Sequence, residues 1–130
     1  MIRSKFVLDI LELLLDGPEA DLPMLRNQIP FLNEEEREYT GFGVFIGFTY
    51  DSEKIKDYLI ENSSIHVYDG VYINSEELNE DGAEGILHLK DGLINYLEIW
   101  CFSGTYPEKD LSTYILTQGW EGASGEKRSS

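Results

Sequence analysis

Glu98 is the side chain whose surroundings most suggest chemistry, because it is a carboxylate within the otherwise apolar run L-I-N-Y-L-E-I-W. A carboxylate among apolar neighbours must be paired, hydrogen-bonded or shifted in pKa, since burying it bare costs several kcal/mol. Glu98 is therefore either a ligand-binding or acid–base group, or a structural carboxylate held by tyrosine, tryptophan or backbone donors. The sequence leaves both interpretations open, because structural networks also perturb carboxylates.

The other candidate residues are His66, His88 and Cys101, the only histidines and the only cysteine of the chain. The sequence contains no H-E-x-x-H metal motif, no G-x-S-x-G nucleophile turn and no G-x-x-x-x-G-K phosphate loop. Cys101 could pair with His88 on a shared sheet face, and is otherwise a buried, inert thiol. The acid-rich run N-S-E-E-L-N-E-D-G lacks the ligand order of a calcium loop. We therefore predict neither an enzyme nor a metal or cofactor site.

Charge limits the class of partner. The formal net charge is −15 at pH 7, from 25 acidic and 10 basic residues. Such a surface repels phosphates, so we expect neither nucleic acid nor an anionic membrane as a partner. No lysine or arginine lies between Lys56 and Lys90, whereas eight acids lie there: Asp57, Glu61, Asp69, Glu76, Glu77, Glu80, Asp81 and Glu84. This field would steer a basic protein towards the chain, although solubility alone also explains an acidic surface.

We predict a partner-binding surface in this acidic region. The predicted contact residues are five acids and two tyrosines: Glu76, Glu77, Glu80, Asp81, Glu84, Tyr68 and Tyr72. Trp120 is a further aromatic candidate that we expect to be exposed.

The length of 130 residues is typical of a single domain that can bury a hydrophobic core without stabilising disulfides or metal ions. One cysteine allows no intrachain disulfide, which fits a cytoplasmic protein. Acids interrupt the N-terminal leucine-rich run, so we predict neither a signal peptide nor a membrane span there. We expect a domain over residues 1–120 and a polar, flexible tail over 121–130.

Two helices are predicted near the N-terminus. Ser4 can cap the first, whose apolar residues recur at helical spacing up to Gly17-Pro18. The second lies between Asp21 and Pro30, and a short third helix follows Asp51.

The rest of the chain has strand patterns. Residues 42–48 alternate with period two, which predicts a strand with its even-numbered face buried. Three glycines on the opposite face, Gly41, Gly43 and Gly47, indicate close approach of a helix, another backbone or a ligand, of which we favour the helix. A strand over 64–73, broken or turned at Asp69-Gly70, and a late edge strand over 112–120 complete the pattern.

The strongest local signal is Asp91-Gly92, which predicts a tight hairpin. Continued regularly from a two-residue turn, the expected pairs are Lys90–Leu93, Leu89–Ile94, His88–Asn95, Leu87–Tyr96 and Gly85–Glu98. This register places His88 and Glu98 on opposite faces. The fold that we predict is α+β, with an N-terminal helical hairpin packed on an antiparallel sheet of four to five strands.

Two runs resemble the strands of a group of small uncharacterised bacterial proteins: R-E-Y-T-G-F-G-V-F (37–45) and G-A-E-G-I-L-H-L-K-D-G-L-I-N-Y-L-E-I-W (82–100), followed by G-T-Y-P. Those strands read R-E-F-T-G-x-G-x-F and G-A-G-x-x-L-x-x-K-D-G-x-[IL]-x-x-L-E-G-[YF]. Here Glu84 interrupts the small-residue run, and Ile99 stands where glycine usually follows Glu98. The resemblance implies one α+β domain of intracellular bacterial origin and brings no catalytic residue. In size and acidity alone, the chain also resembles immunity proteins, which neutralise bacterial toxins that are often basic nucleases.

Three functional hypotheses are compatible with these features. The first is an immunity-type protein that blocks a basic toxin, in particular a nuclease, with its acidic region. The second is a housekeeping protein that binds a small molecule near the glycine-rich strand and Glu98. The third is an enzyme that uses Glu98 and His88 as acid and base, and it is the weakest because the expected register separates those two residues. The oligomeric state is left open.

Overall fold

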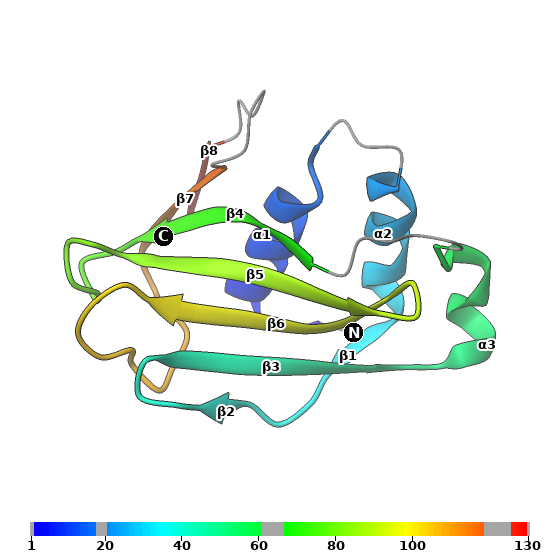
Figure 1. The fold of residues 1–130 in the computed structure, drawn as a ribbon, viewed down its shortest axis with the longest axis horizontal. Helices are drawn as coiled ribbons and strands as arrows, with labels where there is room; N and C mark the ends of the chain where they lie inside the picture. The colour runs from blue at the N-terminus through cyan, green and yellow to red at the C-terminus, as the bar shows by residue number, and fades with distance from the viewer. Residues whose placement is uncertain (1, 18–20, 61–66, 119–125, 130) are drawn as a thin grey trace.

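The protein, a computed structural model, is described over residues 2–17, 21–60, 67–118 and 126–129. Its helical elements are α1 (Lys5–Leu14), α2 (Leu22–Gln28), η1 (Ile29–Phe31), α3 (Ser52–Ile55) and η2 (Lys56–Tyr58). Its strands are β1 (Leu32–Glu34), β2 (Glu38–Tyr39), β3 (Gly43–Tyr50), β4 (Val67–Asn74), β5 (Ala83–Lys90), β6 (Leu93–Cys101), β7 (Tyr114–Gln118) and β8 (Glu126–Ser129). This architecture confirms the predicted α+β class, and the N-terminal helices pack on an antiparallel sheet (Figure 1).

The sheet is larger than predicted. Eight strands pair antiparallel in the order β1-β3-β6-β5-β4-β7-β8, with β2 also on β3, so the expectation of four to five strands is wrong. The additional strands come from polar sequence: β1 and β2 flank the acid-rich stretch after Phe31, and β8 lies in the expected tail. Backbone pairing, rather than a hydrophobic pattern, defines such short strands. Because β8 pairs with β7, β7 is not the edge strand that we expected, and Glu126–Ser129 differ from a structureless tail.

The N-terminal helices form as their sequence predicts. Ser4 Oγ accepts a hydrogen bond from the amide of Val7 at 3.1 Å, which caps α1. One stripe of α1 is buried against β4, β5 and β7, and α2 contacts β6. In Figure 1 both helices therefore cover the same face of the sheet, with α1 behind β4 and β5.

Strand β3 buries its even-numbered face, as predicted for Val44, Ile46 and Phe48, whereas Phe42 before the strand is 68% exposed. The glycines opposite do not face a helix. A Cβ on Gly43 would lie 1.8 Å from the carbonyl oxygen of Ile99, so this glycine allows close approach of the neighbouring strand, whereas a Cβ on Gly47 would meet the side chain of Glu35 at 3.1 Å. The helix that we favoured there is wrong.

The close contact between helix and sheet occurs on β5 instead. A Cβ on Gly85 would lie 3.0 Å from Cγ2 of Ile10, on the buried face of the sheet. Glycine at this position therefore lets α1 sit directly on the strand, on the opposite side of the sheet from the glycine strip of β3.

The Asp91-Gly92 turn joins β5 to β6 with positive φ at both residues, 52° and 80°. Lys90 pairs with Leu93 and Leu89 with Ile94, as predicted. Beyond these pairs the register shifts, because Asn95 is an extra residue on β6 and forms a β-bulge. The observed pairs are His88–Tyr96, Leu87–Leu97, Ile86–Glu98 and Gly85–Ile99, so the predicted pairs from His88 outward are wrong.

Candidate functional site

The sheet has a second face that α1 and α2 do not cover (Figure 1). On β6, Leu97, Ile99 and Cys101 are buried under the helices, while Tyr96, Glu98 and Trp100 alternate with them and are only half-buried. Cross-strand pairing places side chains of β3, β5 and β4 beside these three. We call this surface the open face and define it by Phe45, Tyr72, Glu84, Ile86, His88, Tyr96, Glu98 and Trp100. This definition of the open face includes only residues that the structure describes.

The centre of the open face holds a histidine–glutamate pair. His88 Nε2 lies 3.0 Å from Glu98 Oε1, and the imidazole stacks on the ring of Tyr96 with centroids 4.2 Å apart. The side chains of His88 and Glu98 are 23% and 27% exposed. Phe45 meets Tyr96 edge-on at 6.0 Å, so the pair sits in a largely aromatic surround.

The bulge at Asn95 brings these two residues together. Without it, His88 and Glu98 would project from opposite faces, as the regular register predicted. The acid–base hypothesis was the weakest because the predicted register separated His88 from Glu98. That prediction is wrong, because the two side chains are hydrogen-bonded to each other. Cys101, in contrast, is buried on the other face, so the considered Cys101–His88 pair is also wrong.

One end of the open face carries an aromatic cluster around a second carboxylate. Glu84 on β5 is paired with Tyr72 on β4 and with Trp100 on β6. Phe102 meets Trp100 edge-on at 4.7 Å and lies 6.3 Å from Tyr72. Tyr72 and Phe102 are 40% and 42% exposed. We call Tyr72, Glu84, Trp100 and Phe102 the aromatic cluster.

The acidic loop between β4 and β5 contains four of the other predicted contact residues, Glu76, Glu77, Glu80 and Asp81, and two of them connect it to the β6–β7 loop. Glu77 accepts hydrogen bonds from the amides of Ser112 and Thr113, at 2.8 and 3.4 Å, and pairs with Lys109 at 2.9 Å. Lys109 and these amides lower the pKa of Glu77 to about 2. Asp81 accepts a hydrogen bond from Ser103 Oγ at 2.8 Å.

The exposed acids Glu76 and Glu80 are available to a partner. They line a shallow cavity of about 480 Å³ together with Asn74, Ser75, Asn79, Thr113, Tyr114 and Ile115. Tyr72 is exposed as predicted, but Tyr68 is only 8% exposed and faces the core, which excludes it as a contact residue. The bulge between Tyr68 and Val71 turns the strand at the Asp69-Gly70 step and changes which residues face outward. His66 and Trp120 lie outside the described residues.

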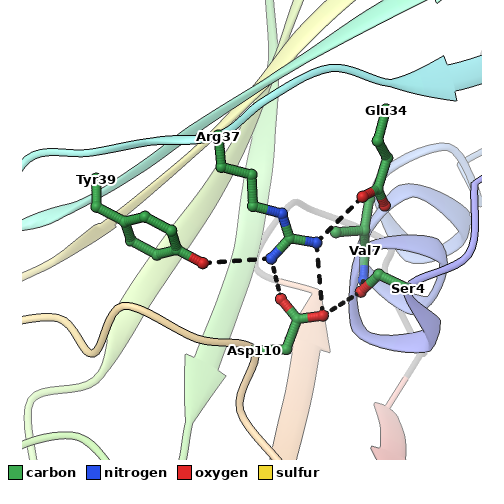
Figure 2. A network of polar contacts seen from close by, with 6 residues as sticks. All are labelled: Ser4, Val7, Glu34, Arg37, Tyr39 and Asp110. Atoms are coloured by element: carbon green, nitrogen blue, oxygen red, sulfur yellow. Dashed lines mark hydrogen bonds and ion pairs between the residues drawn. The ribbon is translucent and has the colours of Figure 1, made fainter.

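Sequence reasoning missed one polar network (Figure 2). The guanidinium of Arg37, before β2, donates to both carboxylate oxygens of Asp110, to Glu34 at 3.3 Å and to the hydroxyl of Tyr39 at 3.4 Å. Asp110 also accepts from Ser4 Oγ at 2.5 Å. Burial alone would lower the pKa of Arg37, but the hydrogen bonds with Asp110 and Tyr39 outweigh it and raise the pKa. Arg37 is part of the R-E-Y-T-G run, which was the only sequence signal of this role.

Two other cavities lie at Phe48–Tyr50 with the Asp91 turn, and at α1 with Arg26 and Pro30; neither contains His88 or Glu98. Within the described ranges, no three His, Cys, Asp or Glu side chains are grouped to hold a metal ion. No helix in those ranges has the length and apolarity needed to cross a membrane.

Comparison with known proteins gave no match: no family model, no curated protein and no solved structure matches this chain. The resemblances noted from the sequence therefore stay expectations.

Proposed function

We propose that this protein binds a basic protein partner through the open face of its sheet, as an immunity-type inhibitor of a toxin. The observation that carries the proposal is the composition of that face: aromatic rings from three strands surround the carboxylates Glu84 and Glu98. Tyrosine and tryptophan are enriched among residues that dominate protein–protein binding energy. An antiparallel sheet whose second face is solvated usually presents polar residues there instead.

Charge specifies the partner. The net charge of −15 attracts a cationic protein and repels nucleic acid. A toxin whose own substrate is nucleic acid carries the complementary basic surface. Covering that surface with an acidic protein would block substrate entry, and like-charge repulsion would exclude acidic competitors.

The position of the contact residues changes relative to the sequence-based hypothesis. Glu84 and Tyr72 belong to the open face, whereas Glu76 and Glu80 lie beside it on the β4–β5 loop. We assign the tight contact to the open face and long-range attraction to the loop, because central aromatic residues determine complex lifetime and rim charges mainly determine association rate.

The test is coexpression with the basic toxin domain encoded beside the gene for this chain. Wild-type protein is expected to restore growth and to bind the purified domain. Tyr72→Ala and Phe102→Ala should each weaken binding by at least about fivefold, the loss that follows from removing about 1 kcal/mol of contact energy.

Tyr50→Ala is the matched control, because Tyr50 is an aromatic residue with 36% exposure at the far end of β3 and is not part of the open face. Its binding should equal that of the wild type. Absence of a neighbouring basic toxin, or failure of the wild-type protein to bind it, would overturn the proposal.

A further inference from the structure

The aromatic cluster has the composition of a subsite for one cationic side chain. Tyr72, Glu84 and Trp100 stand side by side on three adjacent strands, because Glu84 is paired with both rings. Neighbouring strands are about 4.8 Å apart, so the backbones of Tyr72 and Trp100 lie at roughly that spacing on either side of Glu84, and the three side chains leave the sheet on the same face. Phe102 contacts both rings and closes one side.

We propose that this cluster binds an arginine side chain of the protein partner, an inference that rests on the proposed function. A guanidinium is planar, so it can stack on an aromatic ring and still donate two parallel hydrogen bonds to one carboxylate. A lysine ammonium gains the charge attraction but cannot make both planar contacts. Cation–π attraction to tryptophan, the ring that attracts cations most strongly, adds to the binding.

The second carboxylate of the open face has no tryptophan directly across a strand from it, because Glu98 is paired with Phe45 and Ile86. Glu98 already contacts His88 at 3.0 Å, and that imidazole stacks on Tyr96, so one oxygen and one ring face are engaged within the chain. Glu84 also makes contacts within the chain. A carboxylate has about four lone-pair sites, however, so two further hydrogen bonds from a guanidinium can be accommodated. Tyr72 and Phe102 are exposed and Trp100 is half-buried, so part of each of these residues is accessible to a partner.

The experiment is an NMR titration of the full chain with Nα-acetyl-arginine-amide, followed at the indole N–H of Trp100. Trp120→Phe assigns that signal. The arginine probe should saturate the Trp100 shift at millimolar concentration. Nα-acetyl-lysine-amide should bind at least about threefold more weakly, and the neutral citrulline analogue should give no saturable shift, because it lacks the charge.

Glu84→Gln should weaken arginine binding at least about fivefold, since it removes the charge-assisted pair and keeps the size of the side chain. Glu108→Gln is the control, because Glu108 is an exposed carboxylate on the β6–β7 loop, outside the open face. The inference is overturned if arginine and lysine bind equally, or if Glu84→Gln binds arginine as the wild type does.

The same variants separate this inference from the proposed function. If Glu84→Gln binds the toxin domain as tightly as wild type while Tyr72→Ala does not, the arginine subsite is wrong and the binding function stands. If the wild-type protein binds the arginine probe at Trp100 but not the toxin domain, the subsite stands and the function is wrong.

Discussion

Individual carboxylates have different structural roles in this chain, and its 25 acidic residues cannot be distinguished by residue type alone. Glu77 holds a loop, Asp110 neutralises a half-buried arginine, Glu98 pairs with a histidine, and Glu84 lies between aromatic rings. Only contacts distinguish these roles, since charge and exposure alone are similar. Two of the acids therefore give predictions about folding rather than binding.

Removal of Arg37 is expected to destabilise the fold. Arg37→Met leaves Asp110 and Glu34 without their shared cation, at side-chain exposures of 35% and 20%. Losing one member of a fully buried ion pair costs about 3–5 kcal/mol, and partial exposure reduces this to about 2 kcal/mol here. Urea denaturation measures the loss. Arg37→Lys, which keeps the charge but not the forked hydrogen bonds, should lose less; equal stability of Arg37→Met and wild type would contradict the structural role.

The Glu77 contacts predict a local pH dependence. The pKa of Glu77 is lowered from 4.5 to about 2, so its stabilising contribution is present above about pH 4.5 and is lost as pH falls towards 2. After correction for the intrinsic pH dependence of amide exchange, acidification over that window should lower the protection factors of the Ser112 and Thr113 amides, which donate to Glu77. Glu77→Gln should show the lower protection factors already at pH 6. An NMR titration of Glu77 with an ordinary midpoint would contradict the assignment.

Local signals in the sequence predict the elements well where the cause is local. The Ser4 cap, the Pro-containing start of α2 and the Asp91-Gly92 turn depend on neighbouring residues, and each is found as predicted. The bulge at Asn95 has no local signal in the sequence, although it changes the pairing of every residue beyond it. That one residue decides the candidate site, since it places His88 and Glu98 on the same face.

The short strands were not predicted from the sequence, for a related reason. β1 and β2 lie in acid-rich sequence with no period-two pattern, and Arg37 between them donates to Asp110, which is 73 residues away. β8 likewise depends on pairing with β7. Such long-range contacts are invisible to pattern reading, so the number of strands was underestimated.

Gln28 connects elements that are far apart in the sequence. Its buried side chain donates to the carbonyls of Tyr58 and Gly92, at 2.8 and 3.0 Å, and accepts from the amide of Ile94 at 2.9 Å. One residue of α2 therefore connects η2 with the β5–β6 turn. Gln28→Leu should cost about 3 kcal/mol in unfolding free energy, because buried backbone groups lose their partners.

The neighbouring Asn27 provides the control for that change. Asn27 is exposed on the same helix, and Asn27→Leu should change stability by less than about 0.5 kcal/mol. Chemical denaturation compares the two variants directly. If the Gln28→Leu protein is as stable as the Asn27→Leu protein, the three hydrogen bonds of Gln28 contribute nothing to the free energy of unfolding.

At the scale of the whole molecule, helices cover one sheet face and the acidic loop lies beside the other. Glu76 and Glu80 line the cavity next to Asn74 and Ile115, which point to the open side at the ends of β4 and β7. These charges would therefore attract a basic partner towards the open face before it contacts the aromatic rings. Salt screens such attraction over about 8–10 Å.

Neutralising these two acids should slow encounter with a basic toxin domain and leave the complex lifetime nearly unchanged. In stopped-flow association, the double variant Glu76→Gln/Glu80→Gln should bind several-fold more slowly at low salt, with a flatter dependence on ionic strength. Glu77 and Asp81 are kept, because their contacts with Lys109, Ser112 and Ser103 would confound folding with binding. Glu36→Gln/Glu108→Gln removes the same charge elsewhere and should slow association less, since both acids are exposed and neither lies on the β4–β5 loop. Equal slowing by the two double variants would mean that net charge alone steers the encounter, and that the loop has no directional role.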